Sequence, residues 1–358
     1  MKTPGCKKKI YKFIEFIYKP IKNKLHIIHE INFILNSPEF AYKISIVLII
    51  YFAIIYNQVC FAQPTIQASI TIAEQKADSL KKNLLFNDAI IERLSIYKID
   101  SSYKPNIFQL AALYSLTRKM DSSYYFLDIA VKGDSSIRFL SNGDFYFICK
   151  NFQWKNICSD QIIKYELANG PIKRPDLALK LLDMKMKDQA YYSLIDYSNN
   201  KEAIRFWEIK DSLNSINLLL LDSITKNSGW PKKSDVGEYP AVAAFLVVQH
   251  SDLNSQKTYL PYLKKAVRQH EARKQDLALL IDRIKIRENK KQIYGSQISY
   301  DNKTNKNFFD YSKLRNPSKI NSRRKKMGLE PIEDYLKYDQ IIWDYKKFRY
   351  HKNDILTK

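Results

Sequence analysis

The sequence predicts a mainly α-helical protein, in which a helical-hairpin (tetratricopeptide-like) module precedes a helical domain with one small β-hairpin. Apolar residues recur every three or four positions over most of the chain after residue 63, as they do on one face of a helix. One stretch, residues 292–299, instead alternates as a strand does. The 358 residues, 45% hydrophobic and 27% charged, are enough for two folded domains and a targeting segment.

The first 62 residues have the pattern of a targeting segment. Residues 1–43 are basic, residues 44–56 are almost entirely apolar, and small residues stand just before Gln63. This order is typical of a secretory signal peptide. Counted to Ala62, the apolar run approaches the ~20 residues that span a bilayer. We therefore expect an exported protein of the periplasm or cell envelope. The alternative is a protein anchored in the inner membrane by residues 44–62.

The net charge of +22 does not by itself predict nucleic-acid binding. The excess is lysine spread along the whole chain, without a compact basic stripe interleaved with aromatic residues. With only 8 glycines, the sequence has no phosphate-binding glycine loop. We therefore expect no specific nucleic-acid partner.

The sequence also carries no signature of a metal or cofactor site. It has no CxxC, HExxH, GxSxG, EF-hand or dinucleotide-binding motif. Between the predicted leader and the C-terminal tail, residues 63–338 contain two histidines, His250 and His270. These are too few for a histidine-rich metal centre. We expect no metal and no cofactor. Cys149 and Cys158 are compatible with a disulfide or with two buried thiols.

Residues 63–172, here called the hairpin module, are predicted to form short helices. Two of them, residues 106–119 and 122–132, are joined by a polar turn and place small and large apolar residues alternately along their faces. This spacing resembles a tetratricopeptide hairpin. Such a unit suggests a scaffold that holds a protein partner. A plain helical domain packed on its neighbour is the alternative. The residues that carry the resemblance are Ile107, Leu110, Ala111 and Tyr114 on the first helix and Leu127 and Ala130 on the second.

Breaker residues at 169–171 mark the start of a second domain, residues 173–338, and an aromatic, basic tail follows at 339–358. The second domain begins with a leucine-rich helix and a longer helix, residues 201–227, which Gly229 terminates. Short polar motifs then appear in a defined order. They are Asp188-Gln189, Asn217, Gly229-Trp230-Pro231, Gln249-His250-Ser251-Asp252, Asp282-Arg283, Gln292-Ile293-Tyr294-Gly295-Ser296-Gln297 and Arg323-Arg324.

This order resembles the bacterial domain of unknown function 6624 over residues 174–338. Asn214 departs from the pattern, because an aspartate is expected three positions before Asn217. The family has no established activity, so the resemblance implies a fold and a candidate site but no reaction.

His250 is the candidate general base or acid. It is expected to end a helix over residues 240–250, where the helix dipole favours a cationic ring. The alternative is a buried histidine that ties the helix end to a loop. Asp282 and Arg283 are the other candidate catalytic residues, on a helix over 274–287. Because neighbours on a helix diverge by ~100°, one should face inward and the other flank it. Asp282 then either orients His250 or forms a structural ion pair.

The candidate ligand-binding residues lie near the ends of these helices. In a strand over 292–299, Gln292 and Tyr294 would point to one face and Gln297 to the other, with Phe308–Tyr311 as the return strand. Gly295 predicts close approach of another backbone or a ligand. The full set is Trp230, Gln249, Gln292, Tyr294 and Gln297.

Two functions remain open from the sequence. The first is an interaction or structural protein of the cell envelope, in which the hairpin module holds a partner. The second is a hydrolase-like enzyme that uses His250 as general base, with Asp282 and Arg283 orienting the substrate. If the leader is not cleaved, the membrane is a further partner.

Overall fold

The computed structural model describes residues 66–191, 201–301, 304 and 306–344, and the chain divides into two compact units, residues 1–71 and 72–358. The predicted leader, residues 1–62, lies outside the described residues. Residues 66–82 are helical. The fold is mainly α-helical with one two-stranded antiparallel sheet, as predicted. No helix among the described residues is both long and apolar enough to cross a membrane.

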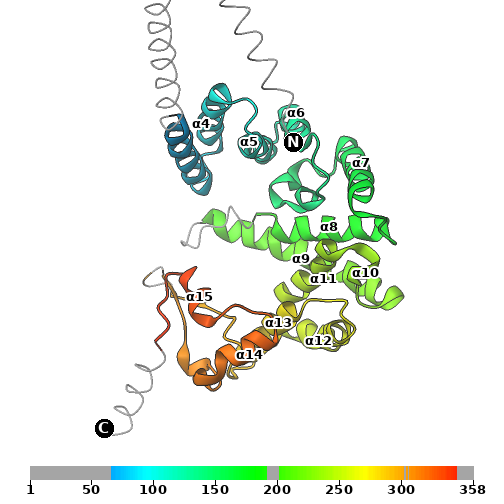
Figure 1. Ribbon diagram of the computed structural model, residues 1–358, viewed down its shortest axis with the longest axis vertical. Helices are drawn as coiled ribbons and strands as arrows, with labels where there is room; N and C mark the ends of the chain where they lie inside the picture. The colour runs from blue at the N-terminus through cyan, green and yellow to red at the C-terminus, as the bar shows by residue number, and fades with distance from the viewer. Residues whose placement is uncertain (1–65, 192–200, 302–303, 305, 345–358) are drawn as a thin grey trace, which may run out of the picture. The chain divides into compact units, whose positions relative to one another are not determined.

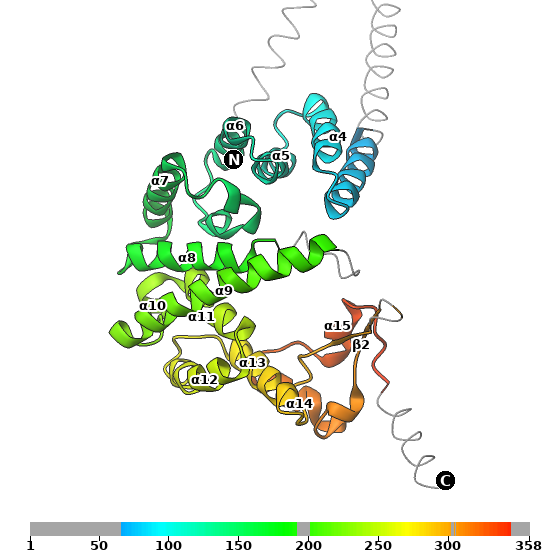
Figure 2. The same ribbon diagram turned by 180° about the vertical axis from the view of Figure 1, so that it is seen from behind.

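The elements that follow are labelled in Figures 1 and 2 where there is room. In chain order they are α4 (Phe86–Ile99), α5 (Lys104–Leu116), α6 (Met120–Val131), the short 3-10 helices η1 (Arg138–Ser141) and η2 (Gly143–Phe147), α7 (Phe152–Asn169), α8 (Pro175–Gln189), α9 (Lys201–Ser228), α10 (Lys233–Val236), α11 (Glu238–His250), α12 (Leu253–Arg268), α13 (Lys274–Arg287), β1 (Ser299–Asp301), β2 (Lys306–Phe308), the 3-10 helices η4 (Tyr311–Lys313) and η5 (Pro317–Lys319), α14 (Ile320–Lys326) and α15 (Ile332–Lys337).

The predicted helical hairpin is present as α5 and α6. Leu110, Ala111 and Leu127 are completely buried between the two helices and their neighbours. The Ser123 hydroxyl donates a hydrogen bond of 2.7 Å to the Ala111 carbonyl, which holds the start of α6 against α5. Arg118, at a φ of 60°, makes the tight turn between the helices. The small residues therefore allow the close approach that the sequence pattern predicts.

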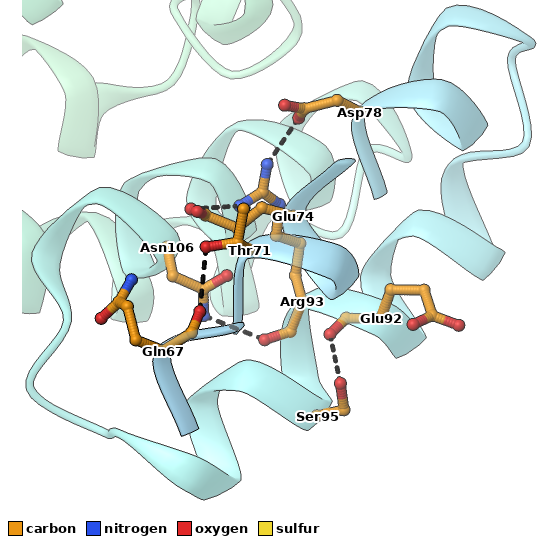
Figure 3. A network of polar contacts seen from close by, with 8 residues as sticks. All are labelled: Gln67, Thr71, Glu74, Asp78, Glu92, Arg93, Ser95 and Asn106. Carbon is orange, nitrogen blue, oxygen red and sulfur yellow. Dashed lines mark hydrogen bonds and ion pairs between the residues drawn. The ribbon is translucent and has the colours of Figure 1, made fainter. Parts of the chain in front are cut away.

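A buried arginine fastens the preceding helix to the hairpin (Figure 3). Arg93 of α4 is only 3% exposed, and its guanidinium lies 3.2 Å from Glu74 Oε1 and 2.5 Å from Asp78 Oδ1. Its backbone carbonyl accepts a hydrogen bond of 2.9 Å from Asn106 Nδ2 of α5. Because the charge is buried, both carboxylates are needed to offset its desolvation.

The second domain is built on α8, α9 and α11. Pro175 stands at the start of α8, where a missing N–H costs nothing, and Gly229 follows the last residue of α9 with a φ of 74°. The predicted end of the long helix at this glycine is confirmed. One continuous apolar cluster extends from α4 through α13, so the hairpin module and the second domain share a core.

A second, smaller core lies in the last part of the described chain. It consists of Phe309, Leu314, Ile320, Ile332 and Leu336. The first residues of the tail pack on it: Trp343 stacks on Tyr311 with ring centroids 5.4 Å apart, and the Tyr311 hydroxyl donates to the Ile342 carbonyl. The rest of the predicted aromatic tail, residues 345–358, lies outside the described residues.

The β-hairpin begins later in the chain than predicted. β1 pairs with β2 so that Ser299 faces Phe308 and Asp301 faces Lys306. The predicted strand over 292–299 is wrong: residues 293–298 form a loop, and Gln292 makes only an isolated bridge to Leu314. The carboxylate of Asp282 accepts the backbone hydrogen bonds that a partner strand would otherwise accept.

Cys149 and Cys158 are free thiols, each partly buried. Burial raises the pKa of Cys149 to about 11 and the pKa of Cys158 to about 12. Both side chains are therefore protonated near neutral pH, where a thiol is a poor nucleophile. Of the two possibilities that the sequence left open, the structure has the pair of thiols.

Candidate functional site

His250 ends α11, as predicted, and its ring is bonded to a carboxylate of α8. Nδ1 lies 2.6 Å from Asp188 Oδ1. The Asp188 side chain is completely buried, whereas the His250 side chain is 24% exposed. Because the carboxylate holds Nδ1 and fixes the ring, Nε2 is the nitrogen left to exchange a proton with another group. This is the base-and-orienter geometry that the sequence suggested, but Asp188 rather than Asp282 is the orienting residue.

Asp188 is the centre of a larger polar cluster. Its second carboxylate oxygen accepts a hydrogen bond of 2.6 Å from Gln189 Nε2. Its backbone carbonyl accepts a hydrogen bond from the ammonium of Lys210 on α9, which is only 2% exposed. Burial lowers the pKa of Lys210, while Asp188 and Asp211 act in the opposite direction. A buried carboxylate and a buried ammonium therefore join α8 to α9 and α11.

The helical spacing of α8 and α9 explains why these groups face one another. On α8, Leu181, Met184 and Asp188 follow one another at helical spacing and are all buried. On α9, Lys210 and Asn217 are seven residues apart and also buried. Asn217 Nδ2 donates a hydrogen bond of 2.8 Å to the Met184 carbonyl. Polar residues thus occupy positions of the buried stripe on both helices, and each bonds across to its neighbour.

Asp282 is an anchor for the loop after α13. It is completely buried and accepts hydrogen bonds from the backbone N–H groups of Ile293 (2.7 Å), Tyr294 (3.0 Å) and Ser296 (3.0 Å). The Ser296 hydroxyl adds a bond of 3.1 Å. Burial raises the pKa of the Asp282 carboxyl, and these hydrogen bonds act against that rise. The loop wraps around the carboxylate, which is why residues 293–298 do not form a strand.

The glutamines of this loop also bond within it. Gln292 is 1% exposed, and its side chain both donates to the Gln297 carbonyl (2.9 Å) and accepts from the Gln297 N–H (2.8 Å). The carbonyl of Tyr294 accepts from the Arg324 guanidinium at 2.8 Å. Burial and the nearby Asp282 raise the pKa of Tyr294, against the effect of Arg323. Gln292 therefore closes the loop with its own side chain.

Gly295 meets side chains of the smaller core. Its φ is 65°, and a Cβ there would lie 2.9 Å from Ile320 Cδ1 and 3.2 Å from Phe309 Cζ. Gly295 is closely approached, but by apolar side chains of the protein itself and not by another backbone.

The remaining predicted residues lie elsewhere in the core. Trp230 is 6% exposed and belongs to the large apolar cluster. Gln249 is 4% exposed, and its backbone carbonyl accepts a hydrogen bond of 2.8 Å from Gln256 Nε2. Arg283 is partly buried beside the inward-facing Asp282, as expected from their divergence. The predicted residues therefore fall into two separate groups. His250 is bonded to Asp188. Asp282 is bonded to the backbone of Tyr294, in the loop where Gln292 and Gln297 bond to each other.

A cleft lies between the hairpin module and the second domain. Its volume is about 580 Å³. Phe108 of α5 and residues 134–144, around η1 and η2, form one wall, and Lys185 and Gln189 of α8 with Tyr239 of α11 form the other. Gln189 connects this cleft to the polar cluster, because its amide also bonds to Asp188. A smaller cleft of about 310 Å³ continues past Tyr239.

Tyr239 connects its own wall of the cleft to the opposite wall through hydrogen bonds. Its hydroxyl lies 2.9 Å from Ser141 Oγ and donates to the Arg138 carbonyl at 3.3 Å. Lys185 Nζ lies 3.5 Å from the ring centroid, and the Arg138 guanidinium lies 5.5 Å from it. Cations at these distances are attracted to the ring. The cleft therefore has an aromatic centre that carries two cationic side chains.

Sequence reasoning did not assign a role to Asp188, Lys210 or the cleft residues. The position of Asp188 on the leucine-rich stripe of its helix was a usable signal, because a carboxylate on a buried stripe requires a partner. Arg138, Lys185 and Tyr239 are far apart in sequence and have no common motif. Within the described residues, no three His, Cys, Asp or Glu side chains form a group that could hold a metal ion.

Comparison with known proteins adds a family but no activity. Residues 175–346 match the family of unknown function DUF6624, which confirms the resemblance seen in the order of the motifs. No curated protein and no solved structure matches the chain.

Proposed function

With residues 175–346 placed in a family of unknown function, we propose that the chain is an exported interaction protein of the cell envelope. The hairpin module and the second domain together hold a protein partner in the cleft around Tyr239. Export is supported by the basic residues 1–43 and the apolar residues 44–56. The helical hairpin, a type of unit used in protein recognition, supports the choice of a protein partner.

The cleft is the observation that carries this proposal. Its volume of about 580 Å³ is in the range of ligand-binding sites, and its lining mixes aromatic, amide, hydroxyl and charged side chains. By contrast, the residues first considered for catalysis around Asp282 are sealed by hydrogen bonds to their own loop. An open, chemically mixed cleft formed by two modules suits recognition.

Photo-cross-linking in cells tests the interaction. A photoreactive phenylalanine replaces Phe108, which lines the cleft, and as control replaces Leu167 of α7, which is 84% exposed and not part of the cleft lining. We expect one envelope protein to be captured from position 108 and not from position 167. Equal capture at both positions, or none at position 108, would refute a partner in the cleft.

The same cells test export. Mass spectrometry of the purified chain should show a mature N-terminus close to Gln63, and the protein should be found in the envelope or periplasmic fraction. A chain that begins at Met1 would favour the membrane-anchored alternative if it is in the membrane fraction. The same N-terminus in the cytoplasmic fraction would exclude both.

The His250–Asp188 pair supports a second candidate, a hydrolase-like enzyme. The contact of 2.6 Å orients the ring, and its 24% exposure leaves the side chain reachable from solvent. In this version Asp188 has the role of orienting His250 that was first considered for Asp282.

Native mass spectrometry after incubation with a cell-envelope metabolite extract tests the enzyme candidate. The wild-type chain should retain or convert a small molecule, and His250→Ala should lose this while keeping its melting temperature within a few degrees. If the wild type retains and converts nothing, or if His250→Ala fails to fold, the pair is structural.

A further inference from the structure

The chain from the last residue of α13 to the last residue of α14 carries many more cations than acids. Residues 287–326 have lysine or arginine at twelve positions and an acid at only three, Glu288, Asp301 and Asp310. Glu288 is already bonded to Lys257 at 2.9 Å and to Lys290 at 2.8 Å. The other two acids accept hydrogen bonds from neighbouring hydroxyl groups. The positive charge of this part of the chain is therefore not balanced from within it.

Backbone hydrogen bonds bring two of its basic runs side by side. Gln292 N donates to the Lys313 carbonyl at 2.6 Å, and Arg315 N donates to the Gln292 carbonyl at 2.9 Å. This is the isolated parallel bridge between Gln292 and Leu314. Lys290 and Lys291, which directly precede Gln292, therefore lie next to the segment that carries Lys313 and Arg315.

Two further cations join them through the carbonyl of Asn316. Lys319 N donates to this carbonyl at 3.1 Å, and Arg323 Nη1 donates to it at 3.2 Å. Arg323 also bonds to the Arg315 carbonyl, and its Nε donates to the Ile293 carbonyl at 2.7 Å. We call these six residues the basic patch: Lys290, Lys291, Lys313, Arg315, Lys319 and Arg323.

The charges of the basic patch are crowded and poorly neutralised. Among the described residues, Lys290 is the one member that forms an ion pair with Asp or Glu. Burial and the neighbouring Arg315 lower the pKa of Arg323, against the effects of Asp282 and Tyr294. Four members are exposed to solvent: Lys290, Lys291, Arg315 and Lys319. Like charges held together in this way repel one another, and an anionic surface would relieve that repulsion.

An exposed apolar side chain at the edge of the basic patch indicates which anionic surface it fits. Tyr311 and Lys313 belong to the same 3-10 helix, η4, and the Tyr311 hydroxyl donates to the Ile342 carbonyl at 2.8 Å. The Ile342 side chain is 84% exposed, and Trp343 next to it stacks on Tyr311. Cations beside exposed apolar and tryptophan side chains are typical of a membrane interface. A nucleic-acid backbone would offer Ile342 no apolar layer to enter.

We infer that the basic patch, with Ile342 at its edge, docks on a membrane surface that contains anionic phospholipid. Its cations contact the phosphate groups, and Ile342 enters the boundary between headgroups and acyl chains. This rests on the proposed export of the chain to the envelope, and it goes beyond the partner proposed for the cleft. No member of the basic patch lines that cleft or its extension, so both surfaces can be occupied together.

Lysine footprinting of the full chain tests the docking surface. The chain is treated with an amine-acetylating reagent, and labelling at each lysine is followed by mass spectrometry. This is done with vesicles of phosphatidylcholine alone and with vesicles of phosphatidylglycerol and phosphatidylcholine in equal parts. Labelling of Lys290, Lys291 and Lys319 should slow about threefold with the anionic vesicles only, because each ammonium then lies against phosphate groups. The exposed Lys150 and Lys155 are internal controls and should label at the same rate with both.

A pair of matched variants tests the apolar edge. Ile342→Ser should lose about half of the slowing at the basic patch, because the apolar anchor is gone while the charges remain. Leu167→Ser is the control, since Leu167 of α7 is also 84% exposed but is not part of this surface. This variant should show the same slowing as the wild type.

The opposing outcomes are distinct. Equal slowing at Lys150 and at the basic patch would mean attraction to the overall charge of +22, and would overturn the inference. Slowing by duplex DNA as large as that by the anionic vesicles, or no slowing by either, would overturn it as well. Cross-linking from position 108 and the mature N-terminus are measured separately. If they come out as expected while the footprint does not, the proposed function stands and the membrane surface is wrong. If they fail, the proposed function itself fails, whatever the footprint shows.

Discussion

Asp282→Ala is expected to lower the free energy of unfolding by about 3 kcal/mol, because it leaves several buried N–H groups without an acceptor. The carboxylate accepts from the backbone of Ile293, Tyr294 and Ser296, and nothing else on α13 can replace it at those positions. The loop should then open, and Gly295 should leave its position against the smaller core. Urea denaturation gives the stability, and hydrogen exchange of the loop amides gives the local effect.

Asp252→Ala is the matched control for this prediction. Asp252 also accepts a backbone hydrogen bond, 3.0 Å from Ser255 N, but it is an exposed N-cap of α12. Its loss should cost about 1 kcal/mol, as is usual for a helix cap. Asp282→Asn should fall between the two, because one oxygen remains while the new amide N–H groups face other donors. If Asp282→Ala costs no more than Asp252→Ala, the anchor role is wrong.

The helices were predictable because their signals are local. Periodicity placed the hairpin and the long helix, and the glycine after Ser228 placed its end. The divergence of Asp282 and Arg283 and the terminal position of His250 also follow from helix geometry alone, although that geometry does not say which of the two neighbours faces inward. These features require only the residues within a few turns of one another, which the sequence contains directly.

The partners of the polar residues were not predictable in the same way. His250 and Asp188 are 62 residues apart, so their contact depends on how α8 and α11 pack. The alternation of Gln292, Tyr294 and Ser296 has the period of a strand, but the backbone N–H groups of this stretch bond to Asp282 and not to another strand. A single carboxylate accepts these hydrogen bonds as well as a partner strand does. Every backbone N–H group needs a hydrogen-bond acceptor, but the pattern of side chains does not show which group in the fold provides it.

The cleft could not be predicted at all, because it belongs to no single element. Its walls come from α5, η1, η2, α8 and α11, and one close contact joins η2 to the end of α8. At Gly143, which opens η2, the chain packs directly on the C-terminal end of α8. A Cβ at this position would clash with the backbone carbonyl of Gln189 and would lie 2.6 Å from Ala190 N.

Gly143→Ala is therefore expected to cost about 2–3 kcal/mol, because backbone atoms on both sides must move apart. The change should also displace Gln189 and the wall that carries Arg138 relative to each other, and so lower the capture of the partner by the photoreactive group at position 108. Urea denaturation measures the first effect, and cross-linking from position 108 measures the second.

Gly170→Ala separates this contact from the general effect of adding a methyl group to a glycine. Gly170 follows the last residue of α7 with a φ of 91°, and a methyl group added there would have no atom within 4 Å. Its cost should therefore be backbone strain alone, about 1 kcal/mol. Cross-linking of the partner from position 108 should be unchanged in this variant. If Gly143→Ala were as stable as Gly170→Ala and captured the partner equally well, η2 would not set the width of the cleft. The two walls would then be held apart by the shared apolar core, in which the hairpin module packs against α8 over a much larger area.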